Sequence, residues 1–278
     1  MELRFLLHSV GVLAPGVSSL SELLALYRTR QPGVAPALVL PSPAMLPANE
    51  RRRASQVVRL VLACAQQAFA TSRYAADQLR SVFASDEGTG EVCQQMLEAL
   101  VSTGQVSPLL FHNSVHNAPS GYFSIAYQNH QPAVSVSMGC ESFAGGLLCA
   151  VSEACTSAQP VLFLAYDAPL PEPMRSLLPI EQATASAWII SSDEGTGGID
   201  AAAGVPDRTP LGCFELSLHA TGACGDQAPT WLPAAWSANS SARSFDVLAL
   251  LADGHGSREF PLGAQRLRVA LVDRGAAC

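Results

Sequence analysis

The sequence contains no lysine. All sixteen basic residues are arginine, against 23 acidic residues, and the formal net charge of the 278-residue chain is −7. The absence of lysine excludes Schiff-base catalysis, attachment of pyridoxal phosphate and the glycine-rich phosphate loop that ends in lysine. Clustered cations are scarce too, because Arg51, Arg52 and Arg53 form the one dense basic run. We therefore expect no nucleic-acid partner, since binding to phosphates requires clustered cations.

Long apolar runs and paired cysteines are also missing. No run reaches the roughly eighteen apolar residues of a membrane-spanning helix, so we expect no membrane span. The eight cysteines include no C-x-x-C pair, and the chain opens Met-Glu-Leu-Arg without a secretory leader. These features predict reduced, mostly buried thiols and a cytoplasmic protein.

Familiar catalytic and metal-binding signatures are absent as well. The sequence has no G-x-S-x-G elbow, no H-E-x-x-H pair and no G-x-G-x-x-G after a strand. His112 and His116 are four residues apart, and on a helix they would share one face as a metal pair does. However, Pro108 and Pro119 flank them, and no third ligand stands at a suitable spacing. We expect neither a metal nor a cofactor.

The residues that are present predict a large packed core. The composition is 49% hydrophobic and 14% charged, which suits buried parallel strands. We expect strands near 3–13, 80–84, 133–138, 160–166 and 184–191. We expect helices near 19–28, 50–70, 91–101, 117–126 and 142–157, with Asn49 as the N-cap of the second. Later strands are expected near 211–219, 245–251 and 267–272. Alternating strands and helices predict one α/β domain over residues 1–278, with 200–278 as a β-rich continuation.

The hexapeptide Ser-Asp-Glu-Gly-Thr-Gly occurs twice, at 85–90 and at 192–197. Each copy follows an apolar, strand-like run. The flanking sequences are not similar, so we interpret the copies as two strand-exit turns and not as a structural repeat.

Four stretches, taken in order, resemble the N-terminal half of β-ketoacyl synthases. They are LPANERRRASQVVRLVLACAQQAF (46–69), SVFASDEG (81–88), SPLLFHNSVHNAPSGYFSI (107–125) and SVSMGCESFAGGLLCAV (135–151). The third is similar to the family's Asn-Ala-x-x-Gly helix entry, and the fourth to its strand–elbow–helix with the nucleophilic cysteine. The resemblance covers roughly residues 1–190. It implies a thiolase-like half, a mixed five-stranded sheet flanked by helices, with a β-rich C-terminal extension.

The resemblance aligns Cys140 with the family's nucleophile. A cysteine at the start of a helix is favoured as a thiolate by the helix dipole. The family usually has a small residue next, whereas here Glu141 follows, and an acid there raises the pKa of the thiol. Two roles for Cys140 remain open, a nucleophile and a structural or tunnel-lining thiol.

Decarboxylation of a malonyl unit requires further donors, which in this family are two histidines supported by a lysine of the C-terminal half. The lysine is absent. The fragment HATGACGD, which begins at His219, faintly resembles the family's HGTGT…GD loop, but it follows Cys140 sooner than the family's order of elements implies. His255 lies in a glycine-rich turn with nothing more specific.

The resemblance is closest to a short branch found with bacterial aryl-polyene pathways, whose members look like chain-length-factor subunits. It implies a non-catalytic subunit that pairs with a catalytic β-ketoacyl synthase and shapes its acyl tunnel in polyketide or fatty-acid-type elongation. An acyl carrier protein is a further possible partner. His116 and Asn117 would hydrogen-bond loops near the dimer seam and acyl pocket. The side chains expected to bound the tunnel are Tyr122, Phe123, Met138 and Phe143.

Two other hypotheses stay open. One is a stand-alone β-ketoacyl synthase or acyltransferase that uses Cys140 as nucleophile and His116 or His219 as base. The other is a homodimeric scaffold that binds acyl carrier protein. An obligate subunit should accumulate poorly without its partner, whereas a scaffold should be stable when expressed alone.

Overall fold

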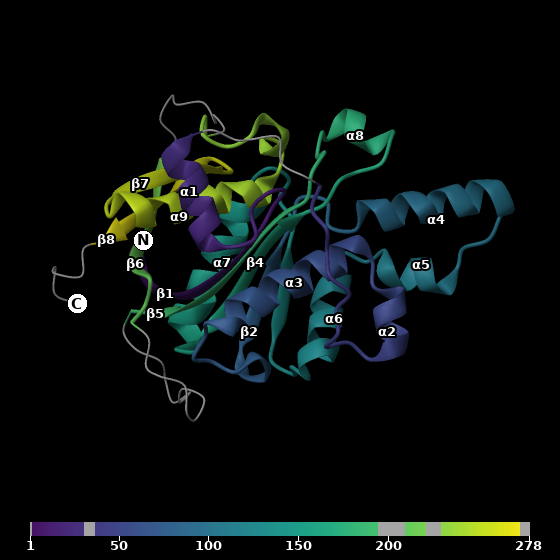
Figure 1. Ribbon diagram of the computed structural model, residues 1–278, viewed down its shortest axis with the longest axis horizontal. Helices are drawn as coiled ribbons and strands as arrows, with labels where there is room; N and C mark the ends of the chain where they lie inside the picture. Colours follow the sequence, from purple (N-terminus) through teal and green to yellow (C-terminus); the bar gives the residue numbers. More distant parts are fainter. Residues whose placement is uncertain (1, 31–36, 194–208, 221–228, 273–278) are drawn as a thin grey trace.

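A computed structural model of the chain describes residues 2–30, 37–193, 209–220 and 229–272. Its centre is one eight-stranded mixed sheet in the order β3-β2-β4-β5-β1-β6-β8-β7 (Figure 1). β2 runs parallel to β3 and β4, and the other neighbouring strands are antiparallel. The strands are β1 (Glu2–Leu13), β2 (Arg80–Ala84), β3 (Ala133–Val136), β4 (Val161–Asp167), β5 (Thr184–Ser192), β6 (Gly212–Ala220), β7 (Gly256–Leu262) and β8 (Gln265–Val272).

The α/β fold with a mixed sheet confirms the fold-class prediction. The five strands of the first 192 residues lie together in the sheet, and the three strands of the C-terminal part extend the same sheet beyond β1. The helices are α1 (Leu20–Thr29), α2 (Ala48–Arg53), α3 (Gln56–Ala70), α4 (Gly90–Thr103), α5 (Pro108–Asn113), α6 (Ala118–Tyr127), α7 (Ser142–Ser157), α8 (Met174–Leu177) and α9 (Arg243–Asp253).

The helices cover both faces of the sheet and create two cores. Helices α1, α7 and α9 pack on one face, and α3 and α6 pack on the other. The central strand β4 is buried along its whole length and contributes to both cores in alternation. Its Phe163 belongs to the α7 side, whereas Leu162 and Leu164 belong to the α3 side. Helices α4 and α5 extend to the right in Figure 1, away from β7 and β8.

Two short helices replace the single helix expected over 50–70. Asn49 lies inside α2, so its predicted role as an N-cap is wrong. Ser55 takes that role for α3, and its side chain accepts a hydrogen bond of 3.3 Å from the Val58 amide. Ala54 is extended and separates the two helices. A serine immediately before the apolar run was the stronger cap signal.

The strand expected near 245–251 is also wrong, because these residues lie in α9. Apolar residues are nearly continuous there, and such a run does not distinguish a buried helix from a buried strand. Gly254, with φ of 75°, ends the helix, and β7 follows two residues later without having been predicted. The first SDEGTG copy leaves β2 as predicted. The second lies mostly outside the described residues.

Among the described cysteines Cys64 and Cys213 are buried, Cys140 is exposed and the other three are partly buried, so the expectation of mostly buried thiols is wrong for these residues. Six cysteines are free, and Cys224 and Cys278 lie outside the described part. None of the helices in the described ranges is both long and apolar enough to cross a membrane.

Candidate functional site at the carboxyl ends of the parallel strands

The carboxyl ends of β2, β3 and β4 bring three loops together. Parallel strands end at one edge of a sheet, where α/β proteins usually bind ligands. The β2 exit begins at Ser85, whose amide donates a 3.2 Å hydrogen bond to the carbonyl of Val136 in β3. Ser137 then donates from its hydroxyl to the carbonyl of Asp86 at 2.7 Å. The β2 exit loop is therefore fixed directly against the loop that follows β3.

Asp167, the last residue of β4, ties these loops together. Its Oδ1 accepts hydrogen bonds from the Asp86 amide (3.0 Å) and the Ser85 hydroxyl (3.3 Å). Its Oδ2 accepts one from the amide of Ser241 (2.7 Å), in the turn before α9. Burial raises the pKa of Asp167 to about 6, although the hydrogen bonds from Ser241 and Asp86 oppose that shift.

The loop after β3 is the predicted strand–elbow–helix. Gly139 has φ of 60°, a left-handed conformation that favours glycine. Ser142 closes the turn: its hydroxyl donates to the Gly139 carbonyl (2.7 Å) and accepts from the Met138 amide (2.8 Å). Cys140 sits in this elbow with its side chain exposed, directly before the sixteen-residue α7. Cys140 therefore lies in the turn between β3 and α7, and its role there stays a prediction.

The groups next to Cys140 are already engaged. Glu141 accepts a 2.8 Å hydrogen bond at Oε2 from the amide of Gly263, in the turn between β7 and β8. The Phe143 amide, in the first turn of α7, donates to the Ser240 hydroxyl at 2.8 Å. Ser240 thus occupies one of the amides that a helix N-terminus otherwise offers to a ligand.

Asp86 is a polar residue of the site that the sequence analysis treated only as part of a turn. Its side chain is 9% exposed, and its Oδ2 is buried without a hydrogen-bond partner. Burial raises the pKa of this carboxyl. A Cβ atom built on Gly139 would lie 3.9 Å from Asp86 Oδ1, so the carboxyl faces the elbow. The one sequence signal for a role of Asp86 was an acidic residue just after a predicted strand.

The histidines do not gather around Cys140. His116 lies against the β2 exit, where a Cβ on Gly88 would be 2.9 Å from its Cδ2, and its Nε2 is buried without a partner. His112 belongs to α5, so the two do not share a helix. The described ranges contain no group of three residues suited to a metal. His219 lies on β6, which is separated from β2 by three strands, and its Nε2 lies 2.8 Å from the Ser217 hydroxyl. Residues 221–226 of its motif lie outside the described residues.

The side chains expected to line a tunnel fall in different places. Met138 is 45% exposed beside Cys140, and Asn117 is exposed before α6. Tyr122 and Phe123 are buried in the core on the α3 side, whereas Phe143 is buried on the α7 side. Only Met138 and Cys140 of this set share the elbow surface.

Exposed apolar side chains concentrate in one stretch of the described chain. Nine of its twelve exposed large hydrophobic residues fall between residues 97 and 138, on α4, α5, α6, β3 and the adjoining loops. We call these nine the apolar end. They are Leu97, Leu100, Val101, Leu109, Phe111, Val115, Ile125, Val134 and Met138.

A groove of about 510 Å³ adjoins this stretch. Its cationic residues are Arg52, Arg53 and Arg59, all exposed, with Glu91 as its one acid. Its apolar residues are Leu38, Leu40, Ala54, Val92, Leu109 and Leu110. We call it the arginine groove. Its local charge is opposite to that of the chain as a whole.

Residues 27–209 match the family described as β-ketoacyl synthase, N-terminal domain, and the chain belongs to this family. No curated protein matches the chain by sequence.

Solved structures give the same assignment of fold. The chain is similar, with 21% identity and a TM-score of 0.71, to a chain of the complex of the ketosynthase ApeO with its chain length factor ApeC from Xenorhabdus doucetiae. That alignment covers 96% of this chain and 99% of the other. A chain of the type II polyketide complex AntDE:AntF, an acyl carrier protein with its ketosynthase, gives 11% identity, a TM-score of 0.71 and coverage of 98% and 99%. A β-ketoacyl synthase from Burkholderia phymatum gives 14% identity and a TM-score of 0.60, and the alignment covers 80% of this chain and 65% of the other.

Proposed function

We propose that the chain is a non-catalytic, chain-length-factor-like subunit that pairs with a catalytic β-ketoacyl synthase. In this role it shapes the acyl tunnel during polyketide, polyene or fatty-acid-type elongation. The observation that carries the proposal is the apolar end beside an open edge strand. Exposed apolar side chains concentrated in one part of a protein are typical of a protein–protein interface.

The edge strand β3 offers free backbone groups to a partner. The carbonyls of Pro132 and Val136 accept hydrogen bonds from β2, so by the two-residue period of a strand Val134 also faces β2. The N–H and C=O groups of Ala133 and Ser135 therefore point away from the sheet. A strand of the partner can extend the sheet here.

The extent of the structural similarity favours a subunit. The two alignments that cover 99% of the other chain are with chains of ketosynthase complexes, one of them with a chain length factor. The Burkholderia phymatum synthase is longer, because the alignment covers 65% of it. A chain of this length therefore has structural counterparts inside ketosynthase complexes.

The chemistry around Cys140 also favours a non-catalytic role. Condensation requires donors placed at the developing oxyanion. Within the described residues His116, which lies between α5 and α6, is the histidine shown against the β2 exit loop, the Phe143 amide already binds Ser240, and the sequence has no lysine. In the proposed assembly His116, Asn117, Met138 and Cys140 face the tunnel or seam. Tyr122, Phe123 and Phe143 support that surface from the cores.

A catalytic role for Cys140 is the second candidate. The exposure of its thiol at the turn before a sixteen-residue helix favours it, because a nucleophile must be accessible to its substrate. In that case the chain would be a stand-alone β-ketoacyl synthase or acyltransferase.

We further propose that the arginine groove receives an acyl carrier protein. Three arginines around an apolar floor suit an acidic amphipathic helix, with charges at the rim and apolar side chains below. Arg59→Glu should weaken carrier binding about tenfold at low salt, measured by fluorescence anisotropy with labelled carrier protein. Arg175→Glu, on α8 outside the groove, serves as the control. An equal effect of both substitutions would contradict this assignment.

We also propose that residues 1–278 form one domain, because the β-rich C-terminal part continues the same sheet. Its free thiols suit the reducing cytoplasm.

The test of the proposed function is co-expression with the ketosynthase encoded nearest to its gene, followed by size-exclusion chromatography with mass determination. We expect a one-to-one heterodimer, and poor accumulation of the chain when it is expressed alone. A protein that elutes alone, as a monomer or homodimer, in the presence of the ketosynthase would contradict the proposal.

A further inference from the structure

Met138 is an exposed apolar side chain that the fold holds in one place. Its backbone is fixed on both sides, because its amide donates to the Ser142 hydroxyl (2.8 Å) and its carbonyl accepts from the Glu141 amide (3.2 Å). Its thioether lies over Gly145, near the start of α7, where a β-carbon would collide with the Sδ of Met138. Glycine at position 145 therefore leaves room for the methionine side chain in this orientation.

The turn between β7 and β8 bounds the space over Gly145 on another side. A β-carbon on Gly145 would lie 3.7 Å from the Cδ1 of Leu262. This turn is held against the elbow, since the amide of Gly263 donates to Glu141 Oε2 at 2.8 Å. The space over Gly145 is thus bounded by α7 and Leu262, and the thioether of the 45%-exposed Met138 fills it.

Under the proposed function, the part of the acyl chain that reaches this elbow is its distal end. The thioester stays on the cysteine of the catalytic partner, and the oxygen atoms near it stay there too. Met138 comes two residues after the end of the edge strand β3, which we propose pairs with the partner, and it belongs to the apolar end. A chain that crosses the seam toward this elbow therefore meets Met138 with its hydrocarbon end, which an apolar side chain suits.

We propose that Met138, seated on Gly145, is the stop for the distal hydrocarbon end of the growing acyl chain, and that Gly145 determines how far this stop projects. The inference rests on the proposed function, because it names the residues that set the length of the tunnel. A methionine side chain is unbranched and flexible, so it can be displaced while its backbone stays fixed. A β-carbon at position 145 drives the thioether away from α7, whereas truncation of Met138 opens the space over Gly145 to the chain.

The test is an elongation assay of the heterodimer with malonyl-loaded carrier protein, in which mass spectrometry gives the lengths of the products. Met138→Ala removes about three heavy atoms and leaves their space open, so we expect products longer than those of wild type by about one two-carbon unit. Gly145→Ala displaces the thioether into the path of the chain, so we expect products shorter by about one two-carbon unit.

The double variant separates a stop at Met138 from other effects of the alanine. With Met138→Ala in place, no thioether remains for Gly145→Ala to displace, so the double variant should give the same product lengths as Met138→Ala alone. Gly121→Ala is the matched control. It makes the same change in helix α6, where a β-carbon would have no atom within 4 Å, and it should leave the product lengths unchanged.

The outcomes separate this inference from the proposed function. Unchanged product lengths in stable Met138→Ala and Gly145→Ala heterodimers overturn the inference alone, and so does a shortening that persists in the double variant. If Met138→Ala dissociates the heterodimer, the product lengths of Gly145→Ala decide, because alanine is a better helix former than glycine and leaves no cavity. Dissociation by both substitutions also overturns the inference, since it assigns Met138 to the contact between the subunits. If wild type forms no heterodimer, the proposed function fails, and this inference fails with it.

Discussion

At one end of the sheet the edge strand β7 carries Arg258, Glu259 and Pro261. At the other end the edge strand β3 spans Ala133–Val136 without a charge or a proline. Charges and prolines on an edge strand prevent it from pairing with another chain. The contrast indicates that the β7 end closes the sheet and the β3 end leaves it open for a partner.

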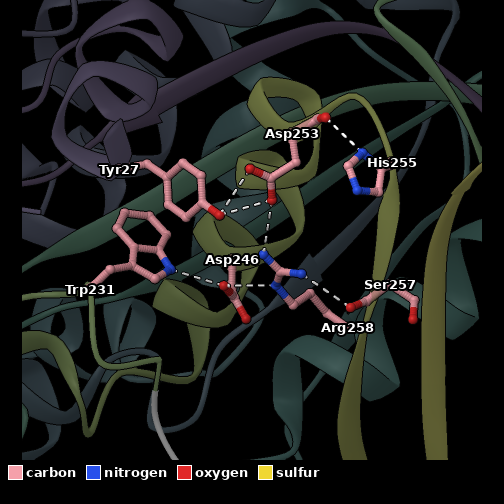
Figure 2. Close-up of polar contacts among 7 residues, drawn as sticks. All are labelled: Tyr27, Trp231, Asp246, Asp253, His255, Ser257 and Arg258. Atoms are coloured by element: carbon pink, nitrogen blue, oxygen red, sulfur yellow. Dashed lines mark hydrogen bonds and ion pairs between the residues drawn. The ribbon is translucent and has the colours of Figure 1, made fainter. Parts of the chain in front are cut away.

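The polar groups behind the two edges differ in the same way. Beside β7, Arg258 pairs with Asp246 at 3.0 Å and Asp253 at 3.5 Å. Trp231 also donates to Asp246, and Tyr27 to Asp253, so each carboxylate has both a cation and a neutral donor (Figure 2). Near β3, Asp86 and Asp167 have no cation among the described residues. The carboxylates beside β7 are paired with a cation of the same chain, whereas near β3 Asp167 accepts only neutral donors and Asp86 Oδ2 has no hydrogen-bond partner among the described residues.

A charge within the apolar end should have the largest effect. Phe111 is 64% exposed, and Phe111→Asp would place an unpaired carboxylate in the interface. We expect the heterodimer Kd to rise by at least about 100-fold, roughly 3 kcal/mol, from lost apolar burial and charge desolvation. Analytical ultracentrifugation of purified subunits measures it. Leu177→Asp, 89% exposed on α8, is the matched control. Equal effects would show that the apolar end is not the interface.

Removal of the Arg258 cation beside β7 should lower the stability of the fold but leave the affinity for the partner unchanged. Arg258→Met leaves Asp246 and Asp253 without their counter-charge, although Trp231 and Tyr27 still donate to them. We expect a loss of about 2 kcal/mol in the free energy of unfolding, measured by urea denaturation of the heterodimer. Its Kd should stay unchanged. A rise in Kd comparable to that of Phe111→Asp would remove the distinction between the two ends.

A proline at the open edge should weaken the heterodimer more modestly. Ser135→Pro removes an N–H that points away from β2, so the sheet stays intact while the partner loses a hydrogen bond. We expect a Kd increase of about tenfold. Ser257→Pro on β7 is the control, because residue 257 has the same outward orientation as Pro261. If the heterodimer tolerates Ser135→Pro as well as the control, the partner does not extend the sheet at β3.

The smallest expected effect is a pH dependence of the free energy of unfolding that arises from Asp167. Burial raises the pKa of Asp167 from 3.8 to about 6, so the folded state binds more protons than the unfolded state between these values. The stabilising contribution of Asp167 is therefore full below pH 3.8 and is lost as pH rises through 6. From pH 7 to 5.5 we expect a gain of about 1 kcal/mol from this group, which Asp167→Asn removes. Denaturant titrations at both pH values measure it. A contribution that falls with acidification would contradict the assignment.

The five strands and the longer helices of the first 192 residues were predictable because each carries its own period or cap, whereas the short helices α2, α5 and α8 were not predicted as separate elements. The run before Asp167 is apolar throughout, as a central parallel strand requires, and the elbow at Cys140 has a recognisable turn. The C-terminal part was less predictable. Phe245 to Leu250 is a six-residue run with one polar residue, Asp246, which is too short to distinguish a helix from a strand, and β7 is a short, partly exposed edge strand that carries charges.

The candidate site was predictable only where one segment forms it. The elbow is formed by a single stretch around Cys140. In contrast, Asp86 faces Gly139, and Asp167 accepts a hydrogen bond from Ser241, and both of these neighbours are far away in the sequence. Long-range contacts of this kind leave no local pattern. The sequence also could not show whether the aromatic residues line a tunnel or pack in a core, because an apolar side chain has the same local sequence pattern in both places.

The most direct test of the central claim is an elongation assay of the purified heterodimer with malonyl-loaded carrier protein, comparing wild type with Cys140→Ala. The account predicts the same rate and the same product lengths, because the chain shapes the tunnel and the partner performs the chemistry. Loss of elongation in a Cys140→Ala heterodimer that still elutes as one species would contradict it, and would identify Cys140 as a nucleophile.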